Sequence, residues 1–391
     1  MIEKMESINP SMLKWARITS GTNLEEMGER FGGADKVLEW EEGKDYPTYS
    51  QLKKICEIYR KPVAIAFFPE PPILKNIPAS CRTIPENIYD SLSHNLIRVI
   101  DEARVMQLNL YELNDDANPS QINFTELQFD YKSSRKVAIQ IRELFGVDLR
   151  VQKRMKSLEQ AFELWRDCFY KLGIYVFKNA FKDNTVSGFC LYDDEFPVIY
   201  INNSFAPSRQ IFTLFHELYH LVCHTSGIDL VNDNFLNTYS NKTNVSIERT
   251  CNQFAGEFLV PDEDFNASIK NEAPTDYLIR KLAETYCVSR EVISRKFLDR
   301  GKMSNEEYQT KREEFNSDYF RAKEAKKEGG NSSGGDYYNT QAVYKGRHYL
   351  GLTYGKYYKK EISITQLSRY LNMKIPSVEA LAAKKGWGDV Q

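Results

Sequence analysis

Residues 212–224 read Phe-Thr-Leu-Phe-His-Glu-Leu-Tyr-His-Leu-Val-Cys-His, an apolar run that contains the pattern His-Glu-x-x-His. On a helix, residues four apart lie on one face, offset by about 40° and separated by about 6 Å along the axis. The imidazoles of His216 and His220 can therefore bind one metal ion, and imidazole suits borderline-soft Zn²⁺. Glu217 points away from that face by about 100°. It is placed to act as the general base that takes a proton from a metal-bound water.

The alternative is a helix that merely happens to carry two histidines, and the surrounding residues argue against it. The run is apolar on most sides, which predicts a buried helix. Burying two imidazoles and a carboxylate costs free energy unless something pairs them. The chain has only five histidines, and three of them are here. His224 lies two turns from His216, so we expect it to have a structural role, hydrogen-bonding near the helix end.

A third metal ligand is needed, because catalytic zinc sites combine three protein ligands with a water. Residues 246–261 predict a later helix that ends at Pro261. Glu248 begins this helix and is the first candidate for the third ligand. Glu257, further along the same helix, is its competitor.

The segment before the metal helix is rich in strand-forming residues. We expect strands at 174–177, 186–192 and 197–203, followed directly by the helix that starts at Pro207. A small sheet that leads into a His-Glu-x-x-His helix is the zincin arrangement, and its edge strand can pair with an extended peptide substrate. Residues 225–245 are polar and Asn-rich, which predicts a loop over the site. Tyr239 in this loop is one candidate to steady an oxyanion.

The chain has 391 residues, which favours two to four domains. The predicted fold class is α+β: a zincin-like metallopeptidase domain with a small mixed sheet, flanked by an N-terminal helix-turn-helix and by helical C-terminal domains. We expect a helix-turn-helix domain at 8–68, then a helical connector and the start of the peptidase domain at 69–172. The zincin core with the metal site is expected at 173–265, and a helical, second helix-turn-helix-like subdomain at 266–322. A flexible linker at 323–335 and a small Tyr-rich helical domain at 336–391 complete the predicted boundaries.

Composition limits the class of protein. No apolar run approaches the length of a membrane span, and the N-terminus has no apolar signal core, so we expect a cytoplasmic protein. The seven cysteines are scattered singly, which indicates reduced thiols and no disulfide framework. The net charge of −2 makes no global electrostatic case for nucleic-acid binding.

Residues 8–68 resemble the helix-turn-helix of phage-repressor (XRE-like) type, with helices expected at 10–19, 23–31, 34–42 and 48–60. In such modules the third helix enters the major groove. Here that helix carries Asp35, Glu39, Glu41 and Glu42 against Lys36 alone. Because phosphate contacts dominate DNA affinity, this acidic helix argues against strong DNA binding. Fold does not fix function, so the two hypotheses for this surface are DNA binding and protein contact.

The motifs between residues 216 and 261 resemble the ImmA/IrrE family of metallopeptidases. They read His216-Glu217-x-x-His220, then Glu248-Arg249-x-x-Asn252-x-Phe254-Ala255-x-Glu257-x-Leu259-x-Pro261. The resemblance implies that His216, His220 and Glu248 hold zinc and that Glu217 is the catalytic base. Thr250 and Cys251 replace the usual Glu-Ala. Family members cleave repressor proteins of phages, mobile elements or stress regulons, and the resemblance extends over roughly residues 8–390.

Two functions follow as hypotheses. The first is a zinc-dependent endopeptidase of a cytoplasmic, repressor-like regulatory protein, in mobile-element, stress or toxin–antitoxin regulation; Mn²⁺ or Fe²⁺ could occupy the same ligands. The second is a non-proteolytic antitoxin or transcription regulator that binds a PIN-type toxin and uses the metal domain as a scaffold. The partner is thus a repressor or a toxin, DNA is an open alternative, and no membrane partner is expected. The sequence does not set the oligomeric state.

Overall fold

The computed structural model describes residues 4–20, 22–59, 61–70, 92–120, 122, 124–131, 133–230, 242–270, 272–328 and 336–385. The chain separates into two compact units, Met1–Glu102 and Ala103–Gln391. The finer domain boundaries expected from the sequence remain predictions. Within the described residues, no helix has both the length and the apolar character needed to cross a membrane.

The first unit is built from short helices, and their bounds agree with those expected from the sequence. The Asn23 side chain caps the second helix by accepting a hydrogen bond from the Glu26 amide (2.6 Å). Gly32 follows that helix with a φ of +95°, a left-handed conformation that favours glycine. The apolar run after Pro62 forms a 3-10 turn and no strand. The elements are α1 (Pro10–Ser20), α2 (Leu24–Phe31), α3 (Ala34–Glu41), α4 (Tyr49–Tyr59) and η1 (Val63–Phe67).

The second unit contains a four-stranded mixed sheet, which confirms the predicted fold class. Its strands are β1 (Tyr175–Asn179), β2 (Val186–Leu191), β3 (Val198–Asn202) and β4 (Gly227–Leu230), in the order β1-β3-β2-β4. β1 pairs with β3 in parallel, and the other pairs are antiparallel.

The loop expected at 225–245 is wrong at its start, because residues 227–230 form strand β4. Only pairing with β2 makes this short segment a strand: Ile228 lies opposite Phe189 in that ladder. The loop is also wrong at its end, since α11 begins at Lys242, ahead of the helix start expected near residue 246. Residues 231–241, with Tyr239, lie outside the described part of the chain.

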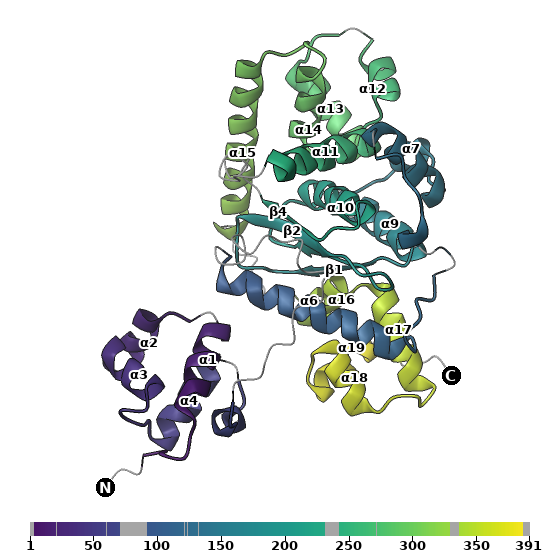
Figure 1. The fold of residues 1–391 in the computed structure, drawn as a ribbon. Coiled ribbons are helices and arrows are strands. Elements are labelled where there is room, and N and C mark those ends of the chain that lie inside the picture. The colour runs from purple at the N-terminus through teal and green to yellow at the C-terminus, as the bar shows by residue number, and fades with distance from the viewer. Residues whose placement is uncertain are drawn as a thin grey trace. The chain divides into compact units, whose positions relative to one another are not determined.

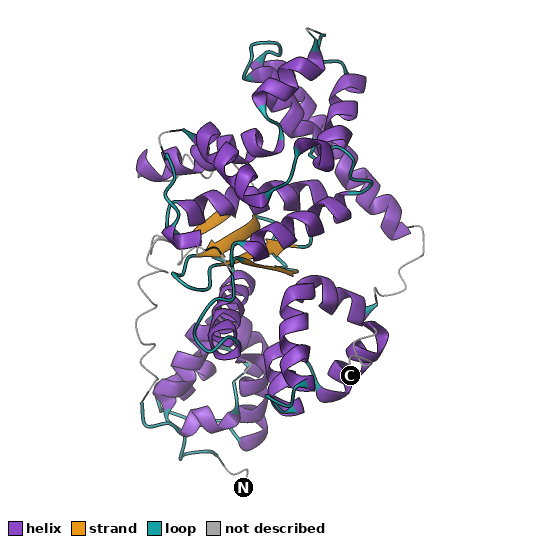
Figure 2. Ribbon diagram, turned by 90° about the vertical axis from the view of Figure 1, so that its right-hand side faces the viewer, coloured by secondary structure: helices purple, strands orange, loops and turns teal. Residues whose placement is uncertain are grey.

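Helices cover both faces of the sheet (Figure 1). α10 (Pro207–Val222) and α9 (Leu158–Lys171) lie on one face, and α11 (Lys242–Leu259) and α7 (Ser134–Phe145) pack beyond α10. Residues 103–113 of α6 (His94–Leu113) and α16 (Tyr337–Lys345) lie on the other face. Figure 2 shows the strands enclosed by these helices.

Stacked aromatic rings hold α10 against α11. The ring centroids of Phe215 on α10 and Phe258 on α11 are 4.1 Å apart, and Trp165 of α9 meets Phe215 edge-on at 5.3 Å. All three side chains are almost fully buried. Buried aromatic pairs of this kind add about 0.5–1.5 kcal/mol each beyond the area they bury. The relative position of α10 and α11 is therefore set by core packing.

The remaining described elements are helical, and one of them corrects the expected linker. α15 continues to Glu328, so residues 323–328 belong to a helix and not to the flexible linker predicted at 323–335. Lys, Glu, Arg and Ala are good helix formers, which outweighs the high charge of this segment. Residues 329–335 lie outside the described ranges. The elements are η3 (Phe124–Glu126), α8 (Leu149–Gln152), α12 (Asp262–Ile269), α13 (Asp276–Tyr286), α14 (Arg290–Leu298), α15 (Asn305–Glu328), α17 (Arg347–Tyr358), α18 (Ile364–Leu371) and α19 (Ile375–Lys385).

Candidate metal centre

Helix α10 presents two buried imidazoles on one face. His216 and His220 are 1% and 4% exposed, and their ring centroids are 5.2 Å apart. Strand β4 lies directly against the second ring: a Cβ added at Gly227 would meet His220 Cδ2 at 2.4 Å. Only glycine leaves room for the imidazole at this position. The two histidines are therefore positioned by the helix spacing and by the close approach of a strand.

Helix α11 brings Glu248 to the same point. One carboxylate oxygen, Oε2, lies 3.0 Å from His216 Nε2, and the other, Oε1, lies 3.4 Å from His220 Nε2. On its other side His216 Nδ1 donates to Asn252 Oδ1 (3.0 Å). With a metal ion in place of the Nε2 proton, the bond to Asn252 would orient the ring, as in metal sites where a second partner orients the ligating histidine. The three ligands predicted from the sequence are thus brought together.

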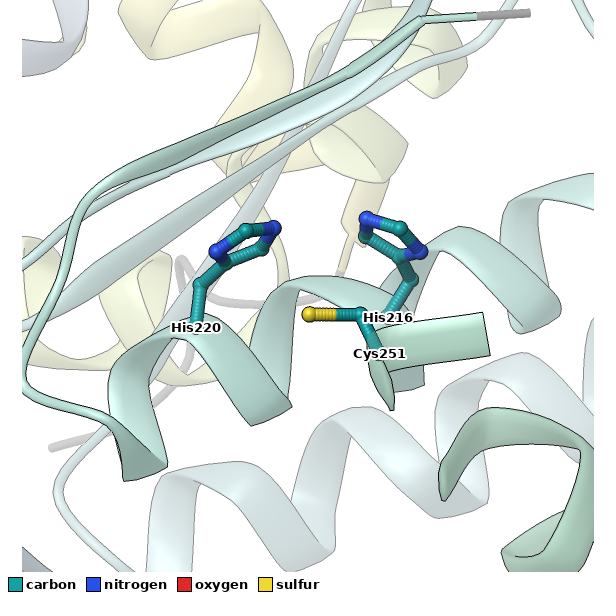
Figure 3. A group of neighbouring side chains, drawn as sticks. All are labelled: His216, His220 and Cys251. Atoms are coloured by element: carbon teal, nitrogen blue, oxygen red, sulfur yellow. The ribbon is translucent and has the colours of Figure 1, made fainter. Parts of the chain in front are cut away.

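Cys251 also points into this centre. Its sulfur and a ring nitrogen of each histidine all lie within 4.8 Å of one another. Figure 3 shows the sulfur directed into the space between the two imidazole rings. The sequence analysis noted Cys251 only as a replacement for the usual Ala and did not identify it as a ligand. The spacing of three residues between Glu248 and Cys251 was the available signal, because it places both on one face of a helix.

Glu217 is fully buried beside the two histidines. Neither of its carboxylate oxygens has a hydrogen-bond partner among the described residues. Burial raises the pKa of Glu217 to about 7, although the neighbouring His220 and His216 favour its ionised form. A carboxyl group with a pKa near neutrality can both accept and donate a proton at neutral pH. This property suits the role of general base that the sequence indicates.

Asp229 on β4 adds negative charge next to the histidines. Its buried carboxylate accepts hydrogen bonds from Arg209 (3.0 Å), Thr213 (2.9 Å) and Ser187. Burial opposes its ionisation, but Arg209 and His216 outweigh burial and hold its pKa below the usual range. Asp229 is not among the site residues expected from the sequence, because it falls in the segment predicted to be a loop. The only sequence signal for a role of Asp229 was an acidic residue between two apolar residues in a short segment.

The carboxylates around His216 stabilise a positive charge at this position. Burial alone would lower its pKa, yet Asp229 and Glu248 raise it to about 10. His220 Nε2 is buried, and Glu248 Oε1 lies 3.4 Å from it. Two imidazoles, a carboxylate and a thiol are donors that suit a divalent ion such as Zn²⁺. The residues present therefore fit a divalent metal ion.

Two other residues from the sequence analysis lie away from this centre. Glu257 is engaged with Lys296, whose Nζ lies 3.0 Å from its carboxylate. It is therefore not available as the alternative third ligand. His224 follows the end of α10, and its Nδ1 lies 2.7 Å from the Tyr192 hydroxyl. This hydrogen bond matches the structural role expected for His224.

Residues 170–298 match the peptidase M78 family model, which describes the IrrE N-terminal-like domain. The match supports the ImmA/IrrE family. It contains every residue of the candidate metal centre. It does not reach residues 8–68, so the resemblance of that region to a helix-turn-helix remains a prediction.

Comparisons with individual proteins add little. No curated protein sequence matches the chain at a significant level. Among solved structures, a transcriptional regulator of Mycobacterium tuberculosis shares 18% identity, covering 41% of this chain and 46% of that chain, with a TM-score of 0.28. A similarity of this size carries no argument about function.

Proposed function

We propose that the protein is a metal-dependent endopeptidase of ImmA/IrrE type that cleaves a cytoplasmic, repressor-like regulatory protein. One arrangement carries the proposal: Glu248 reaches both His216 and His220, at 3.0 and 3.4 Å, beside the fully buried Glu217. The family match at 170–298 supports it. Zn²⁺ is the proposed ion, and Mn²⁺ or Fe²⁺ would accept the same nitrogen and oxygen ligands.

Each residue of the centre has a distinct part in hydrolysis. His216, His220 and Glu248 would hold the ion, which supplies Lewis-acid polarisation of the scissile carbonyl and a more acidic water. Glu217 accepts the proton of the attacking water on a carboxylate oxygen and delivers it to the nitrogen of the leaving amine. Its burial directly beside the two histidines would let this one carboxylate perform both transfers. Asn252 orients the His216 ring by accepting from Nδ1.

The sheet offers a place for an extended substrate. β4 is one of the two edge strands of the described sheet, and it lies against the His220 ring through Gly227. An extended peptide can add to such an edge through backbone hydrogen bonds. A peptide bound there would run past the metal centre, which agrees with endopeptidase activity on a protein chain.

The test uses the purified full chain and the proteins encoded by the neighbouring genes. We expect wild type to hold about one divalent ion per chain and to make a cut that a chelator prevents. Glu217→Gln should keep the ion and the fold but lose the cut, whereas His216→Ala and His220→Ala should lose the ion. The control Glu313→Gln changes an exposed carboxylate on α15 and should behave as wild type. Unchanged cleavage by Glu217→Gln, or undiminished metal content in either histidine variant, would refute the proposal.

The helices of the first unit favour a second candidate function, that of a non-proteolytic antitoxin or transcription regulator. α3 carries an acidic sequence that suits a protein partner better than DNA. In that case the metal centre would be a scaffold, and Glu217→Gln would still neutralise a PIN-type toxin in cells. Loss of the cellular function together with cleavage would instead favour the peptidase.

A further inference from the structure

We propose that Cys251 is a fourth protein ligand of the ion held by His216, His220 and Glu248. The inference rests on the metal centre of the proposed function. The inference adds to that centre a residue of this chain, Cys251, at a position where the family pattern has Ala.

The helix geometry places all four donors on two facing surfaces. His216 and His220 are four residues apart on α10, and Glu248 and Cys251 are three residues apart on α11, so each pair shares one face of its helix. Phe215 and Phe258 stack between the same two helices and hold these surfaces together. The donors are therefore positioned by two rigid elements and not by a loop.

The distances leave only a small adjustment for binding. The sulfur and the two imidazole nitrogens lie within 4.8 Å of one another in the absence of an ion. Zn–N and Zn–S bonds of about 2.1 and 2.3 Å in a tetrahedron give ligand separations of about 3.5 Å. Side-chain shifts on the order of 1 Å therefore bring the sulfur onto an ion that both imidazoles bind.

A second observation points to a ligand at this position. The two carboxylate oxygens of Glu217 are fully buried and accept no N–H or O–H hydrogen bond among the described residues; the Cys190 thiol is their neighbour. Buried polar atoms are normally paired, because leaving one unpaired costs about 1–3 kcal/mol. Figure 3 shows the Cys251 sulfur beside the His216 and His220 rings, and Glu217 directly follows His216 in the chain.

A thiolate ligand changes what the centre does. Four protein ligands close the coordination shell, as in structural zinc sites, whereas a catalytic site keeps one position open for water. Bound Cys251 would hold the peptidase in a resting state until the sulfur leaves the ion. A thiolate also shifts preference from Mn²⁺ towards Zn²⁺. On binding, the thiol gives its proton to the buffer, so wild type should release one more proton per ion than Cys251→Ala.

Cobalt reports directly on sulfur ligation. The full chain, stripped with a chelator, is titrated with Co²⁺, and a sulfur-to-cobalt charge-transfer band is sought in the near ultraviolet. We expect the band in wild type. Cys251→Ala and Cys251→Ser should still bind Co²⁺ but lack the band. Their Zn²⁺ affinity should fall by at least about tenfold, the loss that even an outer-shell partner causes.

Two matched variants complete the test. Cys168→Ala removes a buried thiol from the core around α9 and should keep the band. Cys190, whose thiol neighbours Glu217, is the competing ligand, so a band lost in Cys190→Ala and kept in Cys251→Ala would overturn the proposal. Co²⁺ binding by wild type without the band would also overturn it, while leaving the metal centre of the proposed function intact. No Co²⁺ binding at all would refute both.

Discussion

Glu217 should make the metal-free protein less stable as the pH rises. Its carboxyl group is fully buried, without a hydrogen-bond partner among the described residues, and burial raises its pKa to about 7 from an ordinary value of 4.5. Between these two values the unfolded chain releases the proton while the folded protein retains it, so the free energy of unfolding falls with rising pH. Above pH 7 both states are ionised and the full loss remains.

The size of the effect follows from the two pKa values. Each unit of difference corresponds to about 1.36 kcal/mol, so the loss amounts to about 3 kcal/mol above pH 7. Glu217→Gln cannot ionise and lacks this loss. The free energy of unfolding of the variant minus that of wild type should therefore increase by about 3 kcal/mol between pH 4 and pH 8. Any difference that the amide itself introduces does not depend on pH and does not affect this change.

Hydrogen exchange can measure this difference in the relevant domain. With a chelator present, amide exchange is followed in low urea for peptides from residues 207–222, which form α10. Comparing the two proteins at the same pH cancels the intrinsic exchange rates. We expect the protection ratio to change on the order of a hundredfold from pH 4 to pH 8, since each 1.4 kcal/mol is tenfold. Glu313→Gln is the exposed control and should show no change. A ratio for Glu217→Gln that stays constant across this range would refute the reasoning.

Three further predictions concern the centre and the first unit. Gly227→Ala should weaken Zn²⁺ binding at least about tenfold in a competitive indicator titration, because its Cβ would lie 2.4 Å from His220 Cδ2; Gly351→Ala, in open space on α17, should not. Asn252→Ala should lower Zn²⁺ affinity about 10–100-fold by freeing the His216 ring, whereas Asn252→Asp, which keeps the acceptor, should preserve it. Random duplex DNA should bind weakly at physiological salt, with a shallow dependence on salt concentration, because α3 is acidic; a steep dependence in a filter or anisotropy titration would contradict this.

Much of the predicted fold and site follows from the spacing of residues close together in the sequence. The four-residue separation of His216 and His220 determines that both imidazoles share a helix face, whatever surrounds them. The α+β class followed from three β-rich segments placed among helical periodicities, and β1, β2 and β3 lie where they were expected. The helices of the first unit were also predictable, since the Asn23 cap and the glycine turn act on the backbone beside them.

Other features depend on segments that are far apart in the sequence. Strand β4 exists because residues 227–230 pair with β2, and no strand propensity of its own marks it. Asp229 becomes part of the site only through that pairing. The charged residues 323–328 precede a Gly/Ser-rich segment, and the structure shows that they continue helix α15.

The sequence alone determined that His216 and His220 share one helix face, because helix periodicity is a local property of the chain. Only the tertiary structure decided where Cys251 lies, which glycine makes room for His220, and that Glu217 is fully buried. These depend on how α10 packs against α11 and β4. That packing is the sum of many weak contacts between distant residues, and no short motif encodes it.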